Sequence, residues 1–197
     1  LENAPPVLTY KGNIALATQT NVAMVGARNA SAAGCRMARN IAQELGQRGI
    51  AVTSGLARGI DAAAHQGALG TGTIAVIAGG IDIIYPPEHA ELQARIAAEG
   101  LLVAEMPPGT EPRARHFPYR NRIIAGLSAG TVVVEAIPKS GSLITARLAG
   151  EAGREVMAIP GSPLDPRSRG CNQLIREGAT LVQDASEIVE LIAPLDH

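Results

Sequence analysis

The run Val22–Gly34 constrains the fold of this chain more than any other stretch. It opens with four apolar residues, including two valines and a methionine, which is typical of a buried strand. Gly26 ends that strand, a short turn carries Arg28, and Ser31 is a good N-cap for the helix that follows. A strand that leads through a tight turn into a helix is the repeating unit of α/β proteins.

The same turn has the chemistry of an anion site. Free N–H groups and the helix dipole at a helix N-terminus attract negative charge. Arg28 adds a planar cation suited to phosphate; the alternative is a solvated arginine in an ordinary turn. The dinucleotide fingerprint G-x-G-x-x-G is absent, because Ala27 and Arg28 follow Gly26. We therefore expect no NAD and no other cofactor.

Composition sets broader limits. The 197 residues suit one domain with additional segments, and 46% hydrophobic with only 2% aromatic residues predicts an aliphatic core. A net charge of −1 gives no sign of a nucleic-acid binder. Cys35 and Cys171 match no metal spacing. Without a membrane-length apolar run or a signal peptide, we expect a cytoplasmic protein with no membrane contact. Because Leu1 is not preceded by Met, we expect a piece of a longer chain.

Apolar runs alternate with helical patterns along the rest of the chain. We expect strands near 22–25, 50–53, 74–78, 101–104, 131–135, 156–159 and 180–182. We expect helices near 31–48, 88–99, 142–153, 172–177 and 185–192, and an alanine-rich helix after Asp61. This alternation predicts a mostly parallel sheet with helices on both faces. We divide the chain into an irregular lead-in (1–20, anchored by Tyr10 and Leu16), a domain (21–193) and a tail (194–197).

A second turn repeats the design of the first. Ser54–Asp61 follows a strand, contains Arg58 and leads into a helix. Because the carboxyl ends of parallel strands share one edge of a sheet, we expect Arg28 and Arg58 to face one crevice. Asp61 either caps the following helix, which we favour, or holds Arg58. His65 lies among alanines, and we expect it to be structural.

Residues 113–122 hold four arginines, two of the four aromatic residues and no acid. We expect a long connection over 107–119, with a helix starting only near Ile123. Phe117 is expected either to stack on a nucleic-acid base or to lie in the aliphatic core. A third turn, Pro138–Ser142, resembles an anion site, because Ser140, Ser142 and Thr145 place hydroxyls around a helix N-terminus.

Successive motifs of this chain closely resemble those of the DNA-processing protein A family (DprA, also called Smf). These motifs are Val25–Arg28 with Ser31 and Gly34, Ser54–Asp61, Phe117–Ser128, Ser140–Ala146, Pro160-Gly161 and Gly170–Ile175. The resemblance covers about Tyr10 to Ile192. The first motif of the family commonly reads Gly-Ser-Arg, and here Ala27 replaces the serine.

The resemblance implies an extended Rossmann-like domain that is not an enzyme. It implies binding and protection of single-stranded DNA during natural transformation, loading of the RecA recombinase, and a homodimer. From the residues and the resemblance together, the expected DNA-binding set is Arg28, Arg58, Phe117, Arg120, Asn121, Arg122, Lys139, Ser140, Gly141, Ser142 and Thr145.

The alternative function is a nucleotide-processing hydrolase similar to the lysine-decarboxylase-like proteins. Those proteins carry a Pro-Gly-Gly-x-Gly-Thr run that leads to a glutamate. Gly130–Glu135 matches only its end. Glu135 is expected instead to lie at a strand end and to order an arginine. The sequence offers no nucleophile–base pair and no metal cluster.

Overall fold

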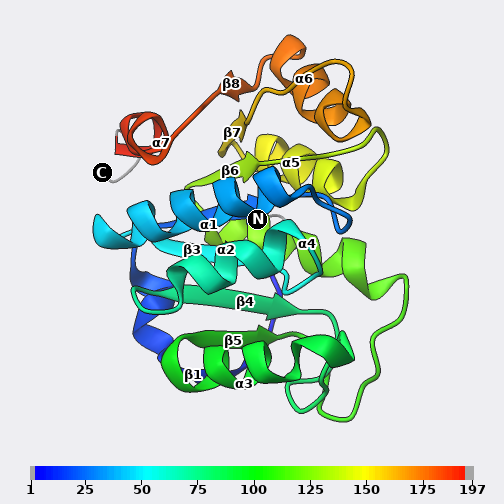
Figure 1. Ribbon diagram of the computed structural model, residues 1–197. Coiled ribbons are helices and arrows are strands. Elements are labelled where there is room, and N and C mark those ends of the chain that lie inside the picture. Colours follow the sequence, from blue (N-terminus) through cyan, green and yellow to red (C-terminus); the bar gives the residue numbers. More distant parts are fainter. Residues whose placement is uncertain (1–2, 194–197) are drawn as a thin grey trace.

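The computed structural model describes residues 3–193, so the expected tail at 194–197 lies outside the described residues. Within that range the strands form one eight-stranded sheet in the order β1-β5-β4-β3-β2-β6-β7-β8 (Figure 1). The strands are β1 (Thr9–Gly12), β2 (Asn21–Val25), β3 (Ala51–Ser54), β4 (Thr73–Ile77), β5 (Leu101–Ala104), β6 (Gly130–Val133), β7 (Glu155–Ala158) and β8 (Thr180–Leu181). Only β1 is antiparallel to its neighbour, so the predicted mostly parallel sheet is confirmed.

Helices cover both faces of the sheet, as predicted. They are α1 (Ala32–Gln47), α2 (Ile60–Ala68), α3 (Ala90–Glu99), α4 (His116–Leu127), α5 (Gly141–Glu151), α6 (Arg169–Arg176) and α7 (Ala185–Ile192). The short 3-10 helices are η1 (Ile14–Thr18), η2 (Pro87–His89) and η3 (Pro166–Ser168). Figure 1 shows α1, α2 and α3 in front of the sheet.

The alternation of buried side chains along each strand explains the two layers. Val22 and Met24 of β2 pack with α1, α2 and α7 on one face. Ala23 and Val25 pack with α4, α5 and α6 on the other. Because successive strand residues point to opposite faces, an unbroken apolar strand fits only between two helical layers.

The order of the strands reverses beside β2. The chain runs from β2 through β3 and β4 to β5, then returns to form β6 on the other side of β2. Open α/β sheets bind ligands in the crevice at such a reversal, outside the carboxyl ends of the strands.

Two expectations about local structure are wrong. The lead-in is not irregular, because Thr9–Gly12 pairs with β5 as an edge strand and Ile14–Thr18 is η1. Leu16 anchors this segment in the core, but Tyr10 is 52% exposed because it lies on the outer edge strand. The boundary at residue 20 stays a prediction.

Helix α4 begins at His116, seven residues before the expected start. Pro118 lies in its first turn, where the helix needs no N–H donor, so proline does not prevent helix formation there. The arginine-rich segment is therefore mostly a helix rather than a loop.

Candidate nucleic-acid interface

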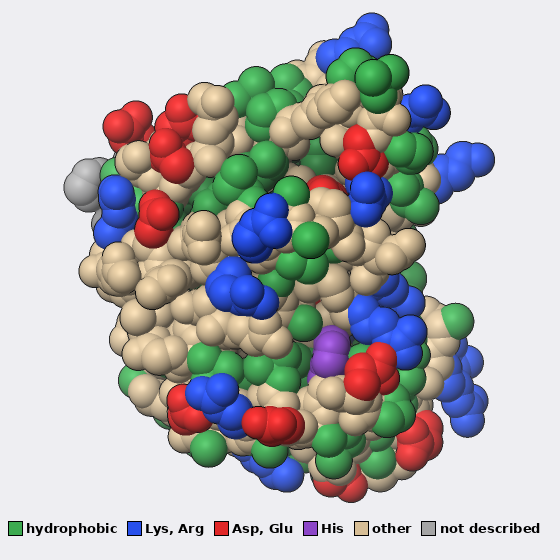
Figure 2. Space-filling model, viewed as in Figure 1, with side chains coloured by type: hydrophobic (Ala, Val, Ile, Leu, Met, Phe, Trp, Pro, Cys, Tyr) green, Lys and Arg blue, Asp and Glu red, His purple; other side chains and the backbone are tan. Residues whose placement is uncertain are grey.

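A groove of about 1100 Å³ lies at the carboxyl ends of β2 and β6, where the order of the strands reverses. Eight of the expected site residues line it: Arg28, Phe117, Arg120, Asn121, Ser140, Gly141, Ser142 and Thr145. A smaller cavity of about 100 Å³ shares Arg28, Phe117 and Arg120 with the groove and adds Arg58. Figure 2 shows Lys and Arg side chains along the right-hand edge, toward which β4 and β5 point in Figure 1.

Phe117 organises a cluster of cations in this groove. The Arg28 Cζ atom lies 5.3 Å from the centre of the Phe117 ring, and the Arg120 Cζ atom lies 6.0 Å from it. The Tyr85 ring is 5.6 Å away at an interplanar angle of 50°. Guanidinium groups at these distances are attracted to the negative face of the ring. Phe117 belongs to none of the apolar core clusters of the described residues, so its placement in the core is wrong.

Arg120 is buried and has partners inside the protein. Its Nη1 donates to the carbonyl oxygen of Gly55 at 2.6 Å and to that of Val76, and its Nε donates to Asn121 Oδ1 at 3.1 Å. Burial lowers the pKa of Arg120 to about 10, although the negative charge of Asp61 acts in the opposite direction. The side chain therefore stays charged at neutral pH while it joins α4 to the ends of β3 and β4.

Arg122 does not reach the groove. Its Nη2 donates to Glu105 Oε1 at 2.6 Å, and its Cζ lies 4.2 Å from the centre of the Tyr119 ring. Residues 117, 120, 121 and 124 follow the helical period and line the groove, so position 122 lies on another face of α4. The resemblance implied that Arg122 lines the DNA pocket; Arg122 is not among the residues that line this groove, and its contact with DNA stays a prediction.

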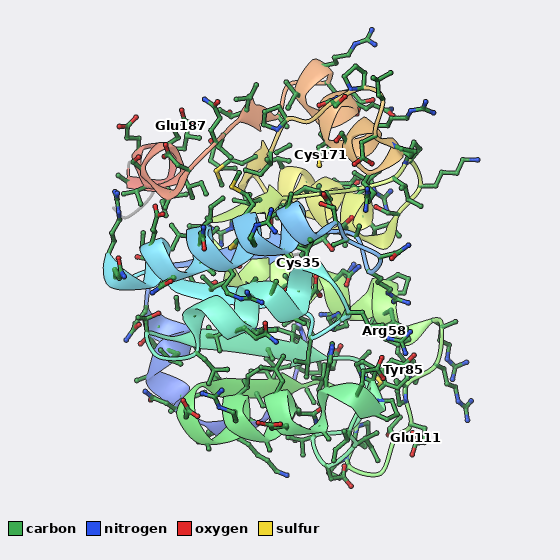
Figure 3. The ribbon with its side chains drawn as sticks, viewed as in Figure 1. Cys35, Arg58, Tyr85, Glu111, Cys171 and Glu187 are labelled. Carbon is green, nitrogen blue, oxygen red and sulfur yellow. The ribbon has the colours of Figure 1, made fainter. Side chains whose placement is uncertain are left out.

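Arg58 is exposed and forms an ion pair with Glu88 at the mouth of the smaller cavity. Figure 3 shows Arg58 and Tyr85 next to each other at the right-hand edge. Asp61 neither caps its own helix nor holds Arg58, so both expectations are wrong. Its Oδ2 accepts the N–H groups of Gly55 at 3.1 Å and Ala57 at 3.3 Å. Asp61 therefore shapes the loop that carries Arg58.

His65 also supports the loop between β3 and α2. Its Nε2 accepts the N–H of Leu56 at 3.3 Å, and its Nδ1 lies 2.7 Å from Thr73 Oγ1. Leu56 has a φ of 56°, which is unusual for a residue with a branched side chain. Burial, helped by the nearby charge of Arg120, lowers the pKa of His65 to about 3. His65 is thus a neutral structural residue, as expected.

The turn before α5 forms another wall of the groove. Ser140 Oγ and Ser142 Oγ lie 2.7 Å apart, and Asn121 Nδ2 donates to the Gly141 carbonyl at 3.4 Å. Ser140 makes no side-chain bond to the backbone of α5, so both hydroxyls face one another at the helix start. Lys139 is exposed with a φ of 66° and is not among the residues that line the groove.

The N-terminus of α1 holds an anion of the chain's own. Ser31 caps the helix, its Oγ accepting the Gly34 N–H at 2.8 Å. The carboxylate of Glu135 accepts the Ser31 N–H at 2.8 Å and the Ser31 O–H at 2.5 Å. Glu135 thus orders a serine at a helix start, and not an arginine as expected. A carboxylate of the chain itself thus lies at a helix start, the kind of place where many α/β proteins bind a ligand phosphate.

Several groove residues escaped the sequence analysis. They are chiefly Tyr85, Pro112, Ile137, Asp165 and Arg167. Tyr85 follows β4 and Arg167 follows β7, so the rule that strand ends meet at one edge would have found both. Tyr85 lies before Pro86 and Pro87, in a segment for which the sequence predicts neither a strand nor a helix.

Residues 3–193 contain neither a candidate membrane span nor a candidate metal site. No helix in this part of the chain is long and apolar enough to cross a membrane. No group of three or more His, Cys, Asp or Glu residues lies together there in a way that could hold a metal ion.

Comparison with known proteins identifies the family. The profile described as DNA recombination-mediator protein A matches residues 1–193. The chain belongs to this family. DNA processing protein DprA from Streptococcus pneumoniae is 48% identical over 95% of this chain, and its X-ray structure superposes with a TM-score of 0.91. DNA processing protein A from Helicobacter pylori, whose structure concerns a single-stranded DNA binding mode, is 29% identical over the whole chain and 91% of its own, with a TM-score of 0.91.

The family resemblance predicted from the motifs is confirmed, and with it the Rossmann-like fold. DNA processing protein DprA from Bacillus subtilis is 44% identical over 94% of this chain. The chain spans 67% of the S. pneumoniae protein and 64% of the B. subtilis protein, so these members of the recombination-mediator family contain further residues outside the matched part.

Proposed function

We propose that this domain binds single-stranded DNA in the groove at the centre of the sheet. The observation that carries the proposal is the cluster of Arg28, Phe117 and Arg120, where two cations and an aromatic ring share one groove. Phosphates pair with arginine, and bases stack on aromatic rings irrespective of sequence. The structure of the H. pylori relative concerns a single-stranded DNA binding mode, which supports the same ligand.

We further propose the cellular role that the family suggests. The bound strand is incoming DNA in natural transformation, which a homodimer of the full-length protein protects in the cytoplasm and passes to the RecA recombinase. Binding without chemistry is the proposed activity. The hydrolase alternative finds little support in the groove, because Glu135 is held by Ser31. Release of base from nucleoside monophosphates, abolished by Glu135→Gln, would favour that alternative.

A titration of labelled oligonucleotides tests the binding proposal. We expect tighter binding to a single strand than to a duplex of the same sequence at equal salt, because the protein has a net charge of −1 and thus no strong overall attraction for duplex DNA. Equal affinities would contradict the proposal.

Two arginine variants locate the site. Arg28→Ala should weaken single-strand binding and flatten its salt dependence by roughly 0.7 log units per log unit of salt, as expected for one lost phosphate contact. Arg147→Ala is the matched control, since Arg147 is exposed on α5, pairs with Glu151 and lies outside the groove. Similar losses in both variants would place the strand elsewhere.

A further inference from the structure

Glu135 follows β6, and it is hydrogen-bonded to the turn of Arg28 through both its side chain and its backbone. Its carboxylate accepts two hydrogen bonds from Ser31, and its backbone carbonyl accepts the N–H of Ala27 at 2.7 Å. These contacts lie on both sides of Arg28 in the sequence. One residue therefore holds both ends of the turn that presents the Arg28 side chain.

Gly34 and Gly26 lie close against Glu135, at its carboxylate and at its backbone carbonyl. A Cβ built on Gly34 would lie 2.5 Å from the Glu135 carboxyl carbon, and a Cβ on Gly26 would lie 2.9 Å from the Glu135 carbonyl oxygen. Real Cβ atoms essentially never approach that closely. Two glycines thus make space for this single side chain and its backbone.

The location is the reversal point between β2 and β6, and the partner is a helix N-terminus. In open α/β sheets this is where a ligand's phosphate binds to helix N–H groups. Here an anion does bind there, but it is Glu135. The hydrogen-bond acceptors that a ligand would bring to this turn are already part of the folded chain.

We propose that Glu135 is a positioning residue: its carboxylate replaces a ligand phosphate at the start of α1 and so fixes Arg28 in place for a phosphate of the strand in the groove. From this turn Arg28 reaches Phe117 and the groove. The inference rests on the proposed function, because it assigns the purpose of a preformed turn to single-strand binding.

Two substitutions at one position separate hydrogen bonding from charge. Glu135→Ala and Glu135→Gln remove the same negative charge, but the glutamine can still accept from the Ser31 N–H and donate to the Ser31 hydroxyl. If Glu135 acted only by repelling DNA, both variants would bind a single strand more tightly. If it positions Arg28, Glu135→Ala binds more weakly and Glu135→Gln keeps the wild-type salt dependence.

The expected size follows from one lost phosphate contact. A slope smaller by roughly 0.7 changes the ratio of wild-type to Glu135→Ala affinity about 2.6-fold between 50 and 200 mM salt. In an Arg28→Ala background, Glu135→Ala should cause no further change, because the residue acts through Arg28. Melting curves show that each variant is folded at the temperature of the titration. Should Glu135→Ala not fold, Glu135→Asp retracts the carboxylate, keeps the charge, and should show the same loss.

Each outcome has a meaning. Equal binding by the folded Ala and Gln variants, or an undiminished loss in the Arg28→Ala background, would overturn the role of Glu135 and leave the proposed function intact. Failure of the wild-type domain to bind single strands would overturn the proposed function, and the role of Glu135 with it.

Discussion

Arg120 makes internal hydrogen bonds and also lines the groove, so its removal should affect both stability and binding. Arg120→Ala leaves the buried carbonyls of Gly55 and Val76 without their donor. We expect a loss of unfolding free energy on the order of 1–3 kcal/mol. We also expect a salt slope smaller by roughly 0.7. Chemical denaturation and a salt series measure the two effects; a stability loss with an unchanged slope would leave Arg120 a purely structural residue.

Phe117 is half-buried in the groove and carries no charge. Phe117→Ala should weaken single-strand binding by about 1–3 kcal/mol through lost stacking, without changing the salt slope. Stability should fall much less than the roughly 3–5 kcal/mol typical of a phenylalanine removed from a core. Phe117→Leu is the control, since it keeps apolar volume but not the ring face. A large drop in melting temperature with intact affinity would assign Phe117 a packing role.

At the scale of single residues, the sequence predicted the site side chains that follow strand ends. It did not predict on which face of α4 each residue lies. The positions of Arg28 and Ser142 in the groove could be predicted because the turns after parallel strands meet at one edge of the sheet. The pairing of Arg122 with Glu105 outside the groove was not predicted, because without the start of α4 the face on which each residue lies is undefined. The backbone partners of Arg120 are Gly55, directly after β3, and Val76 of β4, and no local sequence pattern reveals them.

The loop between β3 and α2 depends on His65 staying neutral. Its pKa is lowered from 6.5 to about 3, chiefly by burial. Below pH 6.5 His65 binds a proton in the unfolded chain but not in the folded chain. The free energy of unfolding therefore falls as the pH drops. Between pH 7.5 and 5.5 the wild type should lose about 1.4 kcal/mol more unfolding free energy than His65→Gln. Parallel denaturant titrations at the two pH values would contradict this if both proteins changed equally.

At the scale of elements, the alternation of apolar runs and amphipathic segments predicted each parallel strand of the described chain. Strand β1 was missed because four residues containing Tyr10 and Lys11 carry no continuous apolar signal. Its pairing with β5 joins positions such as Thr9 and Ala104, far apart in the sequence. Edge strands of this kind are specified by their partner more than by their own composition.

At the scale of the whole molecule, the two walls of the groove come from the two halves of the chain. Arg28 and Tyr85 belong to the first half, and Phe117 and Ser140 to the second. The central pairing of β2 with β6 joins Val22 to Gly130. The connection after β5, the second strand from one edge, returns the chain to the middle of the sheet. The groove therefore lies between motifs that are distant in the sequence.

This strand order has a consequence for the newly made protein. A chain leaving the ribosome can pair β2 with β3 early, but the other side of β2 has no neighbour until Gly130–Val133 has been synthesised. Pairings over such separations form late and slowly. Glu135 and the hydroxyls of α5 follow directly after that strand. An unfinished chain therefore has no groove to occupy, and capacity for a nucleic-acid ligand arises in the same step that closes the centre of the sheet.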